Sequence, residues 1–82
     1  MASPHQQAAD RFIREKQALM NVLRQRIVWH NAQLQQVQDA TEQEAHLGMI
    51  VRDEDTLEDI QKLHVKRKAF YERQNIAIVD LK

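Results

Sequence analysis

Between Pro4 and Gly48 the chain has neither glycine nor proline, the two residues that most often end a helix. The stretch is rich in Ala, Leu, Gln, Glu and Arg, which lose little side-chain freedom in a helix. Ser3 and Pro4 are typical of a helix start, because Ser caps the first turn and Pro suits the first helical position. We therefore expect one long helix over residues 4–47.

Apolar residues in this predicted helix recur with the alternating three- and four-residue spacing of a coiled-coil seam. The seam consists of Ile13, Met20, Leu23, Ile27, Leu34 and Val37, with Lys16, His30 and Thr41 at the remaining positions. Phe12 and Leu19 widen the stripe, and Val28 and Trp29 extend it sideways. We expect this helix to contact more than one neighbour.

The sole glycine, Gly48, is placed to end the first helix, because glycine readily adopts the left-handed conformation found just past a helix end. Residues 49–51 would then be a short, buried apolar connection, and Asp53 or Asp55 would cap a second helix over residues 55–75. Residues 41–44, Thr-Glu-Gln-Glu, also have capping-box spacing. A break near residue 40 and a short middle helix around residues 41–47 are therefore a second possibility.

The second predicted helix has a seam of its own and a favourable distribution of charge. The seam consists of Thr56, Ile60, Leu63, Arg67, Phe70, Gln74 and Ala77, flanked by Leu57, His64 and Tyr71. Carboxylates cluster over residues 53–59 and basic residues follow, which suits the helix dipole at both ends. Residues 76–81 are rich in β-branched side chains, so both helix and an extended tail are compatible with them.

These patterns predict an all-α fold, an antiparallel, coiled-coil-like helical hairpin with a single helical domain over residues 1–82. The second predicted helix is shorter than the first, so it would leave the N-terminal part of the first helix uncovered. An uncovered apolar stripe marks an association surface, so we expect a homodimer or the capture of another helical protein. The predicted protein interface consists of Phe12, Ile13, Leu19, Met20, Leu23, Ile27 and Trp29.

Charge gives little indication of a nucleic-acid partner. Twelve basic residues balance twelve acidic ones; residues 1–41 carry +2 and residues 42–82 carry −2. A small nucleic-acid-associated regulator is the alternative function, and its contacts would be Lys62, Lys66, Arg67, Lys68 and Arg73. Three of these residues are consecutive, so they spread around the helix rather than forming one stripe, and a solvated face is the favoured interpretation.

Catalytic and metal-binding chemistry has little support in the sequence. The chain has no cysteine, one serine that is placed as a cap, and no glycine-rich loop, so we expect no enzyme and no cofactor. The four histidines lack the spacing that puts two ligands on one helical face, and we expect no metal site, although Glu42 and His46 could supply half of one. His30 lies in the seam, where it could make assembly sensitive to pH.

The longest apolar runs, residues 49–51 and 76–79, are far too short to span a bilayer, and the N-terminus lacks the order of a signal peptide. We therefore expect a soluble, cytoplasmic protein that has no contact with membranes.

The predicted function of the chain is that of a small interaction protein of the adaptor, chaperone or inhibitor type, which acts by packing its helices against a second copy or another helical protein.

Overall fold

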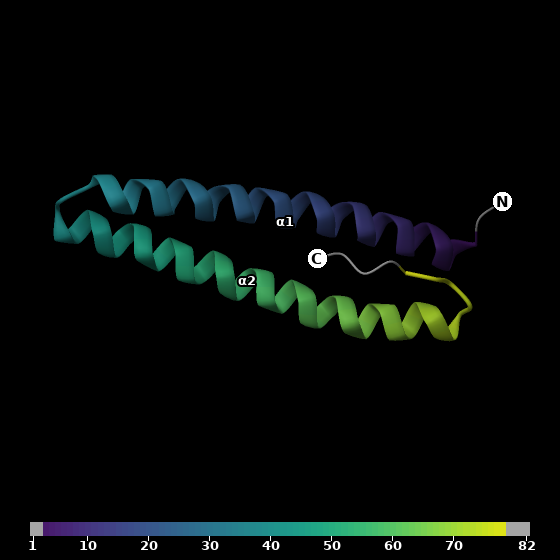
Figure 1. Cartoon of the computed structure of the whole chain (residues 1–82). Coiled ribbons are helices and arrows are strands. Elements are labelled where there is room, and N and C mark those ends of the chain that lie inside the picture. Colours follow the sequence, from purple (N-terminus) through teal and green to yellow (C-terminus); the bar gives the residue numbers. More distant parts are fainter. Residues whose placement is uncertain (1–2, 79–82) are drawn as a thin grey trace.

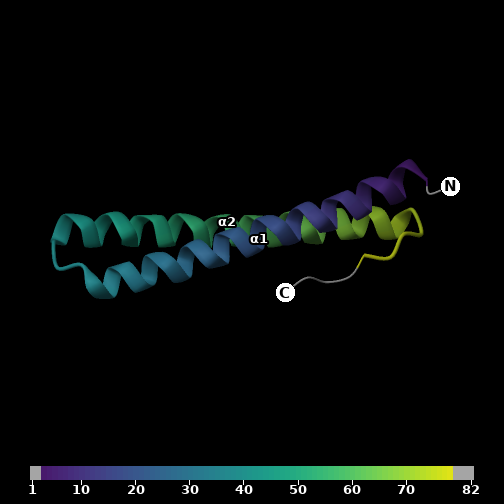
Figure 2. The ribbon, with the colours of Figure 1, turned by 90° about the horizontal axis from the view of Figure 1, so that it is seen from above.

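A computed structural model describes residues 3–78 and contains two antiparallel helices joined by a short loop (Figure 1). Helix α1 runs over Pro4–Gln36 and helix α2 over Ala40–Arg73. The helices lie side by side and cross obliquely (Figure 2), in a molecule 56 Å long and 20 by 16 Å across. The predicted all-α helical hairpin is confirmed.

Helix α1 begins where the sequence indicates. The Ser3 hydroxyl oxygen accepts a hydrogen bond from the Gln6 backbone N–H, with 3.1 Å between the heavy atoms. Pro4 occupies the first helical turn, where its missing N–H has no intrahelical partner to lose. The first helix therefore starts as predicted.

The predicted helix boundaries in the middle of the chain are wrong. Helix α1 ends at Gln36 rather than at residue 47, and residues 37–39 form the loop. Asp39 caps α2 by accepting a hydrogen bond from the Thr41 backbone N–H at 3.2 Å. The alternative of a break near residue 40 was right about the position of the loop, but residues 41–47 are the first turns of α2 rather than a separate middle helix.

Gly48, predicted to end the first helix, lies inside α2 with a negative φ. Glycine costs a helix about 1 kcal/mol relative to alanine, which contacts along the whole hairpin can outweigh. Residues 49–51 are helical as well; Ile50 is buried, as expected for this segment, whereas Val51 is half exposed. Asp53 and Asp55 therefore cap nothing, and the second helix starts 15 residues earlier than predicted.

The two helices have nearly equal lengths, 33 and 34 residues, so the predicted length mismatch is also wrong. Helix α2 covers α1 from end to end (Figures 1 and 2). Ala9 and Lys16, in the N-terminal half of α1, are buried. The N-terminal end of α1 is therefore not an uncovered interaction surface.

The interior of the hairpin follows the predicted seam on α1 and a different line on α2. On α1, Met20 and Leu23 are buried. On α2 the inward line passes through Asp53, His64 and Tyr71, each at most 4% exposed, rather than through the predicted seam of residues 56, 63 and 70. The inward rotation of α2 allows Asp53 to meet a cationic partner on α1 and turns part of the predicted seam toward solvent.

Helix α2 ends in a hydrogen-bonded reversal. Asn75 has a φ of 61°, and the Ile76 backbone N–H donates to the Tyr71 carbonyl at 3.0 Å. This arrangement is the Schellman motif, in which a left-handed residue redirects the chain after a helix. Residues 76–78 are not helical, which confirms the extended alternative for them, while residues 79–81 lie outside the described part.

The residues after α2 return to the hairpin and enlarge its core. Ile76 and Ile78 are buried in one cluster with Ala9 of α1 and Tyr71 of α2, and Phe12 and Ile13 pack against that cluster. The ends of both helices are thereby held together. Neither helix of residues 3–78 combines the length and the apolar character that a membrane-spanning helix needs.

Candidate protein interaction face

Helix α1 carries an exposed apolar stripe beside its buried seam. Leu19, Val22 and Trp29 are 46%, 49% and 55% exposed. Their spacing of three and then seven residues puts them on one side of the helix. Of these three residues, Val22 was not among the predicted interface residues.

Helix α2 carries a matching stripe formed by Leu63 and Phe70, which are 47% and 40% exposed. The two residues lie seven apart and therefore point to one side of the helix. They belong to the seam that the sequence predicted for this helix. The strongest apolar spacing of α2 is therefore directed partly toward solvent.

Contacts between the helices place both stripes on the same side of the hairpin. The Arg67 guanidinium of α2, between Leu63 and Phe70 in the sequence, lies 4.9 Å from the centre of the Phe12 ring of α1. Phe12 precedes Leu19 by seven residues and so shares its side of α1. Nearer the loop, the Trp29 ring lies 5.7 Å from the ring of His46 of α2. We name this side the Trp29 face and define it by Leu19, Val22, Trp29, Leu63 and Phe70.

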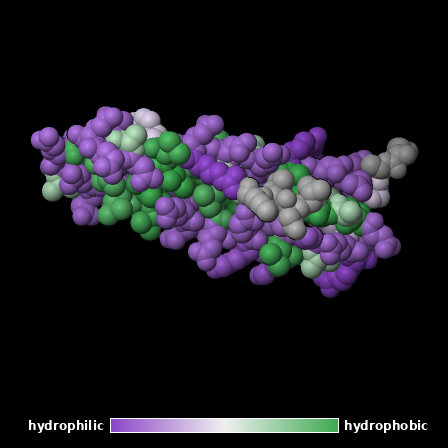
Figure 3. Space-filling view, viewed as in Figure 1, coloured by the Kyte–Doolittle hydropathy of each residue, from purple (hydrophilic) through white to green (hydrophobic). Residues whose placement is uncertain are grey.

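The opposite side of the hairpin, which we name the tail face, is the side on which residues 76–78 lie. Ala77 and Ile78 approach Asp10, Ile13 and Arg14 of α1 there. Figure 3 views the tail face, and hydrophobic groups gather on it in the half nearer the loop. Val28 follows Arg14 by fourteen residues and so lies on the tail side of α1. Glu72 lines a hollow with residues 75–78, and Val65 and Val51 precede it by seven and twenty-one residues, so they lie on the tail side of α2 together with Leu47, one turn before Val51. These four are the large exposed apolar side chains of the tail face.

The predicted interface residues divide between the Trp29 face and the interior. Leu19 and Trp29 are exposed on the Trp29 face. Met20 and Leu23 are buried between the helices. The half-buried members of the set are Phe12, Ile13 and Ile27. The hairpin itself uses five of the seven, so only Leu19 and Trp29 present large exposed surfaces to a partner.

Near Trp29, the hairpin contains an ion pair between its helices. Arg26 donates two hydrogen bonds to the Asp53 carboxylate, Nε to Oδ2 at 3.0 Å and a terminal nitrogen to Oδ1 at 2.5 Å. The Asp53 side chain is 2% exposed and that of Arg26 is 49% exposed. The hydrogen bonds from Arg26 lower the pKa of Asp53, while burial opposes them, so the carboxylate stays ionised. The interpretation of Asp53 as a helix cap is wrong.

Two histidines meet in the same region. The Nδ1 atoms of His30 and His46 lie 2.8 Å apart, a hydrogen bond in which one ring donates and the other accepts. The Trp29 ring packs edge-on against both, at 4.9 Å from His30 and 5.7 Å from His46. The arrangement requires at least one neutral imidazole, because two protonated rings would direct two N–H donors at each other.

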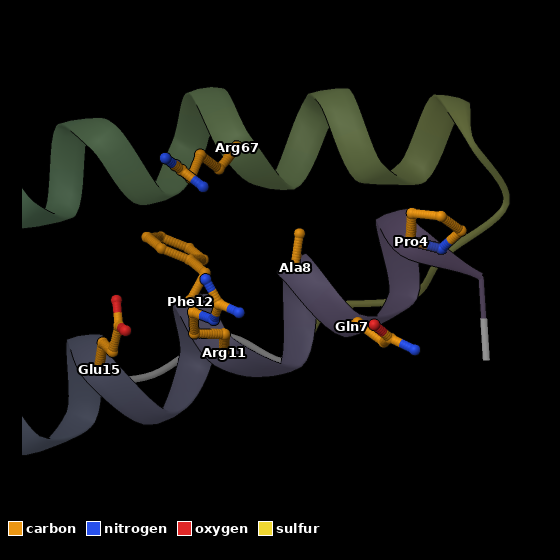
Figure 4. A pocket seen from close by; sticks show the side chains of 7 residues that line it. All are labelled: Pro4, Gln7, Ala8, Arg11, Phe12, Glu15 and Arg67. Carbon is orange, nitrogen blue, oxygen red and sulfur yellow. The ribbon is translucent and has the colours of Figure 1, made fainter.

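The free end of the Trp29 face is hollowed by a shallow groove of about 360 Å³ (Figure 4). The Phe12 ring and Ala8 point from α1 toward α2, and Arg67 reaches back from α2. The groove is lined by Pro4, Gln7, Ala8, Arg11, Phe12, Glu15 and Arg67. Its walls therefore combine an aromatic ring with two guanidinium groups.

The basic residues of the alternative, nucleic-acid function do not share one surface. Lys62 pairs with Glu58 at 3.3 Å, and the partly buried Lys68 lies 3.9 Å from Glu72. Arg67 is engaged with Phe12 on the Trp29 face. Arg67 and Lys68 therefore lie apart from the other three residues. Lys62, Lys66 and Arg73 are exposed, and their spacing of four and then seven residues puts them on one side of α2, so only these three share a surface.

Within residues 3–78, no three side chains drawn from His, Asp and Glu converge in a way that would hold a metal ion. Comparison of the chain with protein-family models, with curated proteins and with solved structures found no match. The candidate site is thus the Trp29 face, which is identified by the exposure and spacing of its apolar side chains.

Proposed function

We propose that this chain is a non-enzymatic helical interaction protein that associates with a second copy of itself through the Trp29 face. The observation that carries the proposal is the alignment of five large, exposed apolar side chains along one side of the hairpin. Exposed apolar side chains gathered on one side in this way are costly in water and are typical of an association surface.

The modest interior of the hairpin supports the proposal. Polar Lys16, Asp53 and His64 occupy buried positions that apolar residues usually fill. Two helices alone enclose little volume, and small chains commonly gain stability by association. A second hairpin laid on the Trp29 face would form a four-helix bundle and would bury the apolar stripes of both copies.

The Trp29 face is better suited to this role than the tail face. It presents a tryptophan and a phenylalanine, residue types that dominate binding energy at protein interfaces. Its exposed residues run from position 19 to 29 on α1 and from 63 to 70 on α2, so both halves of the hairpin contribute. On the tail face, residues 76–78 already cover part of the half away from the loop.

A matched pair of substitutions tests the proposal. Val22 on the Trp29 face and Val51 on the tail face are both helical valines that are 49% exposed. Size-exclusion chromatography with light scattering should give a dimer for the wild type and for Val51→Asp. It should give a monomer for Val22→Asp, because a buried carboxylate without a partner opposes association. Circular dichroism should confirm that both variants remain helical.

Two outcomes would contradict the proposal. One is a wild-type chain that remains monomeric at the highest attainable concentration. The other is a dimer that Val51→Asp dissociates and Val22→Asp leaves intact, which would assign association to the tail face. Leu19→Asp and Leu47→Asp offer a second matched pair, since these leucines are 46% and 44% exposed on the two faces.

A further inference from the structure

Folding separates the charges of this neutral chain along the length of the hairpin. The half that contains the loop, residues 20–57, has three basic and six acidic residues and a net charge of −3. The other described residues, 3–19 and 58–78, have eight basic and five acidic residues and a net charge of +3. Two copies therefore attract each other most strongly when the loop half of one lies on the free half of the other.

This orientation also brings complementary shapes together. Helix α1 spans residues 4–36, so its middle is at residue 20, and Trp29 lies nine residues, about 13 Å, from the middle toward the loop. A two-fold axis across the middle of the Trp29 face lays α1 against α1 of the second copy, with the loops at opposite ends. Trp29 then lies at the level of residue 11 of the second copy, where the groove of Figure 4 is located.

The groove has the chemistry to hold an indole ring. Its lining includes the Phe12 ring, with the Arg67 guanidinium 4.9 Å from the ring centre, and Arg11 beside them. Tryptophan is the aromatic residue that attracts guanidinium groups most strongly through its ring face. The Trp29 side chain is 55% exposed in the hairpin and can insert into a partner.

We infer that the Trp29 face binds a second copy in antiparallel orientation, and that Trp29 of each copy occupies the groove formed by Arg11, Phe12 and Arg67 of the other. The inference rests on the proposed self-association and specifies its geometry. A parallel arrangement would lay α1 on α2 of the partner and put halves of like charge together. It would also leave each groove opposite the partner's free end, far from Trp29.

Disulfide crosslinking distinguishes the two arrangements, because the chain has no native cysteine. Ala8 lies twelve residues before the middle of α1 and Gln33 thirteen after it, so they become neighbours across an antiparallel interface only. An oxidised mixture of the full-length Ala8→Cys and Gln33→Cys chains should therefore give a covalent dimer on a non-reducing gel. A mixture of Gln33→Cys and Ala45→Cys tests the parallel arrangement, since Ala45 is near the level of Gln33 on α2. It should remain monomeric on the gel.

Binding in the groove has its own readout. Trp29→Ala should raise the Kd of the dimer at least about tenfold, the effect expected for an aromatic residue central to an interface. Trp29 is the only tryptophan, so its emission should also shift to shorter wavelength as wild-type dimer forms. A crosslink only in the Gln33→Cys and Ala45→Cys mixture, or an unchanged Kd for Trp29→Ala, would overturn the inference and leave self-association intact. A wild-type monomer would instead refute the proposed function.

Discussion

At the level of single residues, Asp53 makes the stability of the hairpin depend on pH. Its carboxylate is buried, and its pKa is lowered by the hydrogen bonds from Arg26. A group whose folded-state pKa is depressed stabilises the fold above its unfolded value, about 3.9 for Asp, and that stabilisation is lost as the pH falls through the folded pKa. The loss therefore belongs to the range below about pH 4.

We predict that Asp53→Asn destabilises the hairpin at pH 7, because the amide cannot accept both hydrogen bonds from Arg26 as a carboxylate does. The difference in urea midpoint between wild type and variant should shrink as the pH is lowered to 3. Asp55→Asn is the control, because Asp55 is exposed two residues away on the same helix. Equal effects of the two substitutions at pH 7 would show that the Arg26 pair contributes no net stability.

Gly48 offers a second prediction at this scale. A Cβ added to Gly48 meets no atom within 4 Å, and its φ is negative, so alanine fits without strain. Gly48→Ala should therefore raise the free energy of unfolding by about 1 kcal/mol, the difference in helix propensity. Urea unfolding measures it, and Ala45→Gly should lower stability by a similar amount at an exposed position of the same helix. A destabilising Gly48→Ala would argue against a continuous helix through residue 48.

At the level of secondary structure elements, the reversal after α2 depends on one backbone conformation. Asn75 has a φ of 61°. Glycine adopts this left-handed conformation readily because it has no Cβ, and asparagine adopts it more often than most other residues because its short polar side chain can hydrogen-bond locally. Asn75→Ala should lower stability by about 1 kcal/mol, whereas Asn75→Gly should preserve or slightly increase it. Thermal denaturation compares them, with Gln74→Ala as the control because its φ of −93° is ordinary. Equal stability of the two Asn75 variants would contradict the left-handed reversal.

The sequence predicts the start of α1 and the helical character of both elements, but it misplaces the connection between them. Ser3 and Pro4 act locally, so their effect can be predicted from the residues alone. The loop at residues 37–39 contains neither glycine nor proline. Its local signal was the Asp39-x-x-Glu42 spacing, a cap followed by an acidic residue in the first turn. Gly48 was the more conspicuous signal, yet a glycine only weakens a helix that tertiary contacts hold.

The inward side of α2 could not be chosen from its own residues. Two lines of helical spacing run along it, one through Leu63 and Phe70 and the other through Asp53, His64 and Tyr71. Apolar content favours the first line, and the structure buries the second. Asp53 is turned inward by its ion pair with Arg26, which lies 27 residues away on the other helix. A pattern within α2 alone cannot reveal that pairing. Leu63 and Phe70 were consequently missed as interaction residues.

At the level of the whole molecule, the fold class followed from the sequence, whereas the distribution of charge did not. Residues 1–41 carry +2 and residues 42–82 carry −2, which suggests a weak difference between the two helices. The hairpin instead joins the two ends of the chain into a +3 half and leaves the middle of the chain as a −3 half. The antiparallel assembly that we infer follows from this folded arrangement, and only a three-dimensional structure displays it.

The polar pairs across the interior determine how far one helix can slide along the other. Lys16 donates to Gln61, Arg26 to Asp53, and His30 meets His46, so three levels of the hairpin each carry a specific match. Sliding by about one helical turn would bring Asp53 opposite Leu23 and bury a carboxylate against an aliphatic side chain. That misalignment would cost several kcal/mol, whereas a purely apolar seam would tolerate it more easily. The same buried charges that weaken the core thus restrict the chain to a single alignment.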